Sequence, residues 1–337
     1  MKAPGSQTDL IRRLPKAELH LHIEGSFEPE QMMALAERNK IVLPFKTLED
    51  AKAAYAFSNL QEFLDLYYQG MQVLRTEEDF FDLTWAYLQR AKADNVRHVE
   101  MFYDPQAHTE RGVPFGVVTD GILAAIKKGE QELGITSYLI MSFLRHLSEE
   151  DGFDLLVESE PWHDKFIGVG LDSSEMGHPP LKFERLYQRC REIGFKLSMH
   201  AGEEGPPSYV REALLDIGVD RIDHGNRCME DPELVSILRE MQVPLTNCPL
   251  SNLSLCVIDD LKKSPVKAQL EQGLLVTVNS DDPAYFGGYI GRNYEQTAAA
   301  LDLSDSQLIQ LARNSFTASF LLDADKQRHL AEVDAAA

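Results

Sequence analysis

The sequence predicts an α/β protein, a (β/α)8 TIM-like barrel with a helical insertion after the first strand. Eight short β-like runs occur along the chain, separated mostly by helical patterns, as in a barrel of alternating strands and helices. Most runs are almost continuously apolar, which is typical of parallel strands buried on both faces. The runs are Ala17–Ile23, Val96–Tyr103, Ser137–Leu144, Phe166–Asp172, Lys196–Ala201, Arg221–His224, Pro244–Pro249 and Leu274–Asn279.

Helical patterns fill the intervals between the later runs, and several end on a glycine placed where a helix C′ residue is expected. The predicted helices include Leu181–Ile193, Ser208–Ile217, Pro232–Met241 and Pro265–Gln272, and the terminating glycines are Gly194, Gly218 and Gly273.

The segment between the first two runs, about residues 28–95, is strongly helical and longer than a simple crossover. We interpret it as a helical cap over the mouth of the barrel. No linker or repeat divides the chain, so residues 1–337 are predicted to form a single domain. The polar, alanine-rich tail from Asp323 onward is expected to fray.

Composition excludes several classes of partner. Hydrophobic residues make up 44% of the 337 residues and charged residues 26%, which suits a globular protein with a substantial core. The net charge of −21 argues against nucleic acid and anionic membranes, but it is compatible with a small neutral or weakly cationic substrate. The sequence does not predict the oligomeric state.

The cysteines and the N-terminus favour a cytoplasmic location. The first 13 residues are polar and lack the apolar core of a secretory signal, and no uncharged apolar stretch approaches membrane-spanning length. No Cys-x-x-Cys pair occurs, which is typical of free thiols in a reducing compartment; the four cysteines are Cys190, Cys228, Cys248 and Cys256.

Potential metal ligands stand at or just beyond the ends of four runs. His20 and His22 are two residues apart, so both imidazoles point to one face of a strand. With His200 and Asp281, they would meet at the one barrel face where the carboxyl ends of the strands gather. Three histidines and a carboxylate suit zinc, although imidazole also suits other divalent ions. Taken singly, each residue has an ordinary alternative as a satisfied core histidine or a helix N-cap.

Three further residues beside these ligands can carry chemistry. Glu203 follows His200 by three residues and is a candidate general acid/base, or else a solvated loop carboxylate. His224 is a candidate fourth nitrogen ligand, a base that orients a metal-bound water, or a histidine bonded to backbone. Asp281 and Asp282 are adjacent, so one carboxylate at the metal leaves the other facing the pocket, where it can contact a ring nitrogen.

The ordered motifs His-x-His, His-Ala-Gly-Glu, Asp-His-Gly and Ser-Asp-Asp-Pro resemble the adenosine and adenine deaminase family of metal-dependent amidohydrolases over residues 14–322. The resemblance implies one zinc ion held by His20, His22, His200 and Asp281. It also implies that hydroxide attacks C6 of the purine while ammonia leaves. Three more roles follow from it: the proton donor to N1 is Glu203, the residue that holds and deprotonates the water is His224, and the contact to N7 is Asp282.

Within the family, the sequence resembles the adenine branch, which implies a purine base as substrate and a role in purine salvage. Adenosine deaminases typically carry Asp where this chain has Glu24, and the longer side chain is expected to occupy space that a ribose would need. They also carry Gly where Ser173 aligns, and the backbone N–H at that position contacts N3. Three alternatives stay open: an adenosine deaminase, a deaminase of N6-substituted adenines, and a catalytically silent binding or signalling protein on the same fold.

Overall fold

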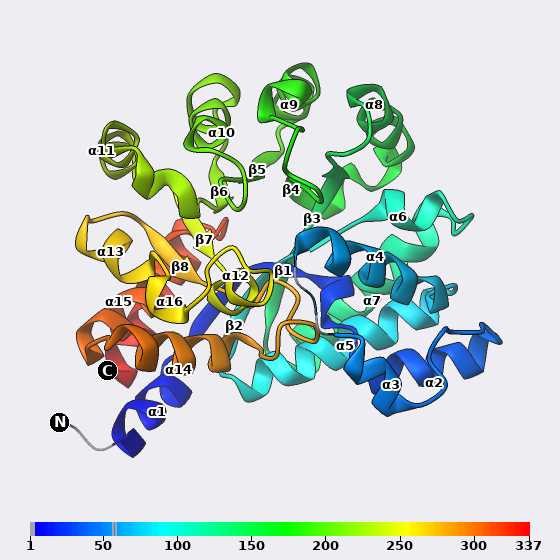
Figure 1. The fold of residues 1–337 in the computed structure, drawn as a ribbon, viewed down its shortest axis with the longest axis horizontal. Helices are drawn as coiled ribbons and strands as arrows, with labels where there is room; N and C mark the ends of the chain where they lie inside the picture. Colours follow the sequence, from blue (N-terminus) through cyan, green and yellow to red (C-terminus); the bar gives the residue numbers. More distant parts are fainter. Residues whose placement is uncertain (1–3, 56, 58) are drawn as a thin grey trace.

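The computed structural model describes residues 4–55, 57 and 59–337. Within this part of the chain, eight parallel strands pair in sequence order from β1 to β8 and lie inside a ring of helices (Figure 1). The barrel is closed by a bridge between Leu21 of β1 and Asp281, which follows β8. His22 N–H donates to Asp281 O at 3.0 Å and Asp281 N–H donates to His20 O at 3.1 Å. The predicted (β/α)8 barrel is therefore confirmed.

The observed strands agree with the predicted runs except at a few ends. The seventh and eighth are shorter than predicted, partly because Pro249 begins a helix rather than ending a strand. The strands are β1 Lys16–His22, β2 Val96–Tyr103, β3 Thr136–Leu144, β4 Phe166–Asp172, β5 Lys196–Ala201, β6 Arg221–His224, β7 Leu245–Asn247 and β8 Val276–Val278.

The helices surround the strands and also fill the insertion between β1 and β2, which contains α2 to α5. They are α1 Pro4–Arg13, α2 Pro29–Asn39, α3 Leu48–Ala53, α4 Leu60–Gly70, α5 Glu77–Ala93, α6 Pro105–Thr109, α7 Phe115–Leu133, α8 Glu149–Glu158, α9 Glu184–Ile193, α10 Pro207–Arg211, α11 Pro232–Met241, α12 Pro249–Ser254, α13 Val266–Glu271, α14 Ile290–Leu301, α15 Asp305–Thr317 and α16 Asp323–Ala336.

Local sequence explains where several helices begin and end. Thr76 and Ser148 form capping boxes with the residues three positions later, which satisfies free backbone N–H groups at the starts of α5 and α8. Gly194 and Gly218 follow helical segments with φ of 103° and 73°, a left-handed conformation that glycine adopts without steric cost. The predicted helix ends at these two glycines are therefore confirmed.

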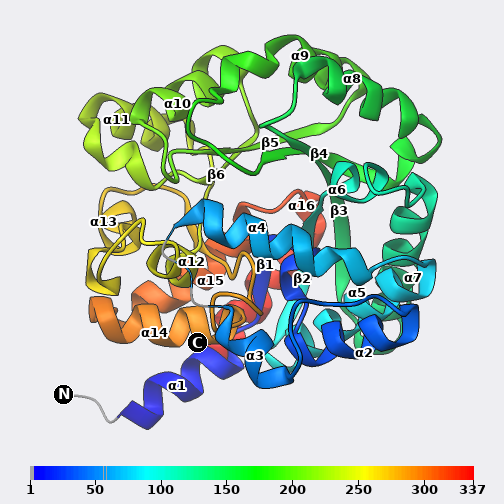
Figure 2. The same cartoon turned by 45° about the vertical axis from the view of Figure 1, so that its right-hand side comes forward.

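The insertion places α4 across the open end of the barrel, in front of β1 and β2 in the turned view (Figure 2). Its apolar face belongs to a separate cluster of buried residues that includes Phe63, Tyr67 and Tyr285. The predicted helical character of this segment is confirmed. The treatment of the whole chain as one domain stays a prediction.

The expectation that the tail from Asp323 frays is wrong. Residues 323–336 form α16, in which His329 and Val333 lie on one face and are buried. The His329 ring stacks on Phe316 of α15 with ring centroids 4.8 Å apart. This contact and the burial of Val333 hold the tail in place.

A buried ion pair joins β2 and β6 inside the barrel. Glu100 and Arg221 pair with both side chains fully buried, and Arg221 Nε also lies 3.5 Å from Asp223 Oδ1. Removing one partner of such a pair leaves a buried charge, which typically costs about 3–5 kcal/mol. We expect Glu100→Gln to lower the free energy of unfolding by about 3 kcal/mol, the lower end of that range, because Asp223 remains near Arg221. Urea unfolding measures this loss.

The matched control for Glu100→Gln is Asp259→Asn. Asp259 pairs with Lys263 on the surface, where both side chains are largely exposed. Exposed ion pairs contribute little to the free energy of unfolding, so the unfolding midpoint of Asp259→Asn should stay near that of the wild type. Equal midpoints for the two variants would show that the buried pair does not stabilise the barrel.

The thiols are as the sequence predicts, because all four cysteines are free and only Cys256 is exposed. Among the helices described, none combines the length and the apolarity needed to cross a membrane.

Candidate metal and catalytic site

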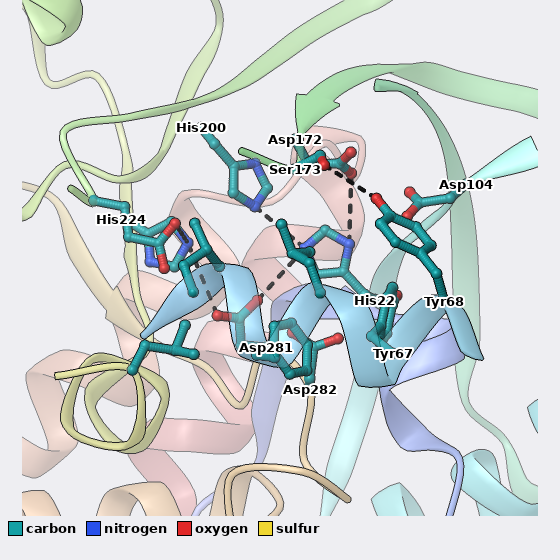
Figure 3. Close-up of a pocket in the computed structure, with 15 residues that line it drawn as sticks. His22, Tyr67, Tyr68, Asp104, Asp172, Ser173, His200, His224, Asp281 and Asp282 are labelled. Atoms are coloured by element: carbon teal, nitrogen blue, oxygen red, sulfur yellow. Dashed lines mark hydrogen bonds and ion pairs between the residues drawn. The ribbon is translucent and has the colours of Figure 1, made fainter. Parts of the chain in front are cut away.

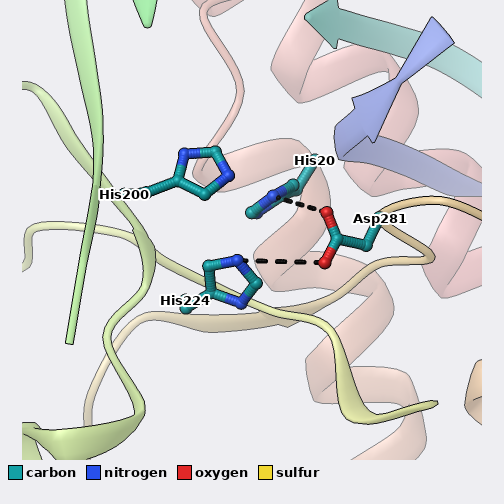
Figure 4. Close-up of side chains that lie close together, drawn as sticks. All are labelled: His20, His200, His224 and Asp281. Atoms are coloured by element: carbon teal, nitrogen blue, oxygen red, sulfur yellow. Dashed lines mark ion pairs between the residues drawn. The ribbon is translucent and has the colours of Figure 1, made fainter. Parts of the chain in front are cut away.

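The predicted ligands meet at the carboxyl end of the barrel. His20 and His22 lie on β1 and His200 on β5, while Asp281 follows β8. His20 Nε2 is 3.1 Å from Asp281 Oδ1, and His22 Nε2 is 3.2 Å from His200 Nε2 and 3.4 Å from Asp281 Oδ1. His224, at the end of β6, belongs to the same group: one ligand atom each from His20, His200, His224 and Asp281 lie within 4.8 Å of one another (Figure 4).

The far ring nitrogen of His20 is fixed by a hydrogen-bonded chain, and that of His200 faces the same Asp223 carboxyl group without a hydrogen bond. The Thr246 hydroxyl donates to Asp223 Oδ1 at 3.0 Å, so it accepts from His20 Nδ1 at 2.9 Å. Asp223 Oδ2 lies 3.6 Å from His200 Nδ1. The hydrogen bond to Thr246 favours a proton on His20 Nδ1, so its Nε2 faces Asp281 and the cluster.

The pairing of His22 with His200 fits a cation. Burial lowers the pKa of His22 to about 4 and, together with the neighbouring histidines, lowers the pKa of His200 well below its usual value, so both rings are neutral. Their Nδ1 atoms face the carboxyl groups of Asp172 and Asp223. The two Nε2 atoms lie 3.2 Å apart, close enough to share a cation.

Three site residues occupy the left-handed backbone region although none is glycine. Ser173, His224 and Asp281 have φ of 76°, 61° and 64°. Each follows or ends a barrel strand and lines the same pocket. Such conformations cost energy, on the order of 1–3 kcal/mol each, and they persist where surrounding contacts hold them, most often at functional sites.

Glu203 lies beside the cluster as predicted for a general acid. Its side chain is buried, and Oε2 is 3.6 Å from His224 Nε2. Burial, and then the charge of Asp281, raise the pKa of Glu203 well above its usual value, which favours the protonated form.

Sequence reasoning gave no structural role to Glu175, which positions the Glu203 loop. Its carboxylate accepts from the backbone N–H groups of Gly202, Glu204 and Gly205 at 2.7, 2.8 and 2.7 Å. These three bonds hold the loop on both sides of Glu203. No spacing rule connects residue 175 with residues 202–205, so only the fold shows this contact.

The pocket above the cluster is closed by α4 (Figure 3). Its cavity volume is about 40 Å³. Phe63 and Tyr67, at helical spacing, belong to the apolar cluster beneath α4 and also line the pocket. The α4 residues of the lining are Leu60, Phe63, Leu64, Tyr67 and Tyr68.

Asp282 and Ser173, predicted substrate contacts, both line this pocket. Burial, and then Asp281, raise the pKa of Asp282 well above its usual value. A Cβ at Gly25 would overlap the Asp282 carboxyl group, so the absence of a side chain there lets Asp282 take its position. Ser173 has the positive φ that glycine adopts readily, and its hydroxyl lies 3.0 Å from the Tyr68 hydroxyl of α4.

Glu24, the third predicted substrate contact, lies behind the pocket wall. It is buried, and the described lining of the pocket does not include it. Its Oε1 accepts from the backbone N–H of Asp104 at 3.0 Å and lies 2.9 Å from His108 Nε2. In this geometry Glu24 acts on the pocket through Asp104.

Sequence reasoning assigned no role to Asp104 and Asp172, which line the pocket. Asp104 follows β2 and Asp172 ends β4. The histidines were predicted as site residues because they are polar groups at strand ends, and the same criterion applies to these two aspartates. Burial, and then the nearby carboxylates, raise the pKa of both groups well above the usual value.

The closed barrel and the His/Asp cluster at its strand ends define a barrel protein able to bind a metal ion beside a buried acid. Comparison with known proteins gives the family. A sequence model described as Adenosine deaminase matches residues 15–336, and the chain belongs to this family.

Its relatives are similar over nearly their whole length. An adenine deaminase of Sphingopyxis alaskensis is 60% identical over 325 residues, covering 96% of this chain and 95% of the relative. One of Wolinella succinogenes is 56% identical, with coverages of 96% and 98%. The crystal structure of adenine deaminase from Arthrobacter aurescens matches with a TM-score of 0.94 at 51% identity, covering 96% of this chain and 98% of that one. An amidohydrolase from Burkholderia ambifaria, with bound Zn, matches with a TM-score of 0.90 at 25% identity, covering 100% and 94%.

Proposed function

We propose that the protein is an adenine deaminase, a hydrolase that acts on the cyclic amidine C–N bond of adenine to give hypoxanthine and ammonia in purine salvage. One observation carries the proposal: the buried acid Glu203 lies 3.6 Å from His224, beside a His/Asp cluster in a covered pocket. The names of relatives at 55–60% identity support the free base as substrate.

The cluster would hold one zinc ion per chain through His20, His22, His200 and Asp281. His22 Nε2 lies 3.2 Å from His200 Nε2 and 3.4 Å from Asp281 Oδ1, and His20 Nε2 lies 3.1 Å from Asp281 Oδ1. Imidazole nitrogens and a carboxylate suit zinc, and the related amidohydrolase with bound Zn supports the choice. Bound there, zinc would supply a water molecule acidified enough to act as a nucleophile near neutral pH. His224 lies close enough to be a further ligand, but its distance from Glu203 suits a role with the water.

Two residues would move the protons of the reaction. Glu203 starts protonated and donates to N1 of adenine, so negative charge does not build up on the ring as C6 is attacked. His224 is neutral, because burial lowers its pKa to about 3, and a neutral imidazole can accept the proton of the attacking water. The amino group then takes the proton held by His224 and leaves C6 as ammonia. The C6 hydroxyl returns a proton to Glu203, and the ring becomes a 6-oxopurine.

Two contacts would orient the base in the pocket. Asp282 retains a proton, because burial raises its pKa, and can donate it to N7. The backbone N–H of Ser173 would donate to N3, since its positive φ is the one that the glycine of adenosine deaminases can also adopt. The purine would thus lie with its six-membered ring toward Glu203.

A substrate panel tests the proposal. On metal-replete enzyme, kcat/KM for adenine should exceed that for adenosine by about 10³-fold or more, because a closed pocket built for the base rejects a ribose. N6-alkyl adenines in the same assay define how much space surrounds the amino group. Preferred turnover of adenosine would reject adenine as the substrate and assign the chain to the adenosine deaminases.

A further inference from the structure

The pocket wall contains two carboxyl groups to which the proposed reaction gives no task. Asp104 and Asp172 are both 97% buried, and their oxygens lie within 4.8 Å of each other and of a His22 nitrogen. Among the described residues, no hydrogen bond of normal geometry reaches Asp104 Oδ1 or either oxygen of Asp172, although the Ser142 hydroxyl and the Asp104 carboxyl group lie beside Asp172. Buried acceptors without donors are rare in proteins, and two together indicate that a ligand supplies the donor.

The backbone on both sides holds these carboxyl groups in place. Asp104 N–H donates to Glu24 Oε1 at 3.0 Å, and Asp172 O accepts from Arg145 N–H at 3.0 Å. Asp172 Oδ2 also lies 3.5 Å from His22 Nδ1. Asp104 follows β2 and Asp172 ends β4, with β3 between them, so the barrel backbone orients both carboxyl groups before a ligand binds.

The carboxyl pair and the catalytic groups stand at opposite ends of the pocket. In Figure 3, His224 lies at one end, and Asp104 lies at the other with Asp172 near it. Glu203 is at the His224 end, where its Oε2 is 3.6 Å from His224 Nε2. In a purine, N9 lies on the edge away from N1 and C6. A base bound with N1 at Glu203 and N7 at Asp282 therefore directs N9 toward the carboxyl pair.

We propose that Asp104 and Asp172 together accept the N9–H of the bound purine and thereby select the free base over purines substituted at N9. The proposal rests on the orientation given under the proposed function. Free adenine carries a proton on N9, whereas a nucleoside carries carbon there. A purine substituted at N9 would leave the buried oxygens of Asp104 and Asp172 without a hydrogen-bond donor. It would also place a carbon atom in contact with them. A site built to hydrogen-bond an N–H group discriminates strongly against analogues that lack it.

The test compares adenine with 9-methyladenine, which loses the N9–H but adds only one methyl group. We expect Asp104→Ala and Asp172→Ala each to reduce kcat/KM for adenine by about 10-fold, mainly through KM, because a hydrogen bond to the buried carboxyl pair is lost. The ratio of adenine to 9-methyladenine should fall by a similar factor. The control is Glu110→Gln, an exposed carboxylate near this wall, which should leave both values unchanged. An unchanged ratio in both alanine variants would overturn the proposal.

Binding measured without turnover separates this proposal from the proposed function. In the Glu203→Gln background, calorimetry should show adenine binding more tightly than 9-methyladenine, and Asp104→Ala should remove that preference. This result supports N9 recognition even if the wild type fails to deaminate adenine. Equal binding of the two ligands rejects it even if deamination is confirmed.

Metal analysis covers the other use of this cluster, since His22, Asp104 and Asp172 are also close enough to share a cation. One metal ion per chain, retained in Asp104→Ala, supports recognition of N9–H. Two ions per chain, with one lost in Asp104→Ala, would assign the carboxyl pair to a second metal site and overturn the proposal.

Discussion

Glu203→Gln is expected to reduce kcat for adenine by about 10²–10⁴-fold while bound metal stays at the wild-type level, because general acid catalysis contributes that much. The amide keeps the shape of the side chain but has no proton to give to N1. Glu203 is buried 3.6 Å from His224, so water cannot easily replace it as the donor. Steady-state kinetics and metal analysis on the same preparation measure the two quantities together.

The matched control is Glu204→Gln. Glu204 is the next residue, only partly buried, and lies outside the described lining of the pocket. The Glu204→Gln variant should therefore keep near wild-type turnover. Near wild-type turnover by Glu203→Gln would show that another group donates the proton and would end the assignment of Glu203 as the acid.

His200→Ala is expected to lose metal and activity together. Its Nε2 is 3.2 Å from His22 Nε2 at the centre of the cluster, and the alanine offers no ligand atom in its place. We expect activity to fall by more than about 10³-fold, because the acidified water is lost with the ion. The thermal midpoint should fall as well, since a metal that binds only the folded chain stabilises it. Metal content, kcat and thermal unfolding measured on one preparation check all three effects.

A histidine outside the site serves as the control. His163, which precedes β4, contacts Ser159 and lies away from the strand ends that hold the cluster. His163→Ala should retain both metal and activity. If His200→Ala retained stoichiometric metal with normal turnover, the cluster would not be the metal site.

The strand-end rule explains how much of the site could be predicted. His20 and His22 share a strand face by their spacing, and parallel strands bring His200 and Asp281 to the same end of the barrel. Local sequence was therefore sufficient to predict that His20 and Asp281, 261 positions apart, would meet. Their roles as ligands stay a prediction, which the metal analysis above tests.

The supporting contacts could not be predicted because they depend on tertiary positions. Glu175 reaches a loop 27 residues further along, and Thr246 of β7 orients His20 of β1, although the two strands are far apart in the sequence. Neither contact follows from periodicity or from a local motif. Glu24 illustrates the same limit: its length suggested a direct contact, but the fold places Asp104 between it and the pocket.

The frayed tail was mispredicted for a related reason. By composition, residues 323–336 are polar and alanine-rich, which suggests a frayed tail. The burial of two side chains, His329 and Val333, instead holds the segment as a helix against the barrel. The stacking of His329 on Phe316 depends on where α15 lies, which the sequence of the tail does not contain.

The bridge between Leu21 and Asp281 has a consequence for how the molecule is held together. The first and last strands of the barrel, β1 and β8, are far apart in the sequence. Few main-chain hydrogen bonds join β1 to the segment that follows β8. A metal ion bound by the histidines of β1 and by Asp281 would add bonds across the same contact. The ion that supports catalysis would then also stabilise the closure of the barrel.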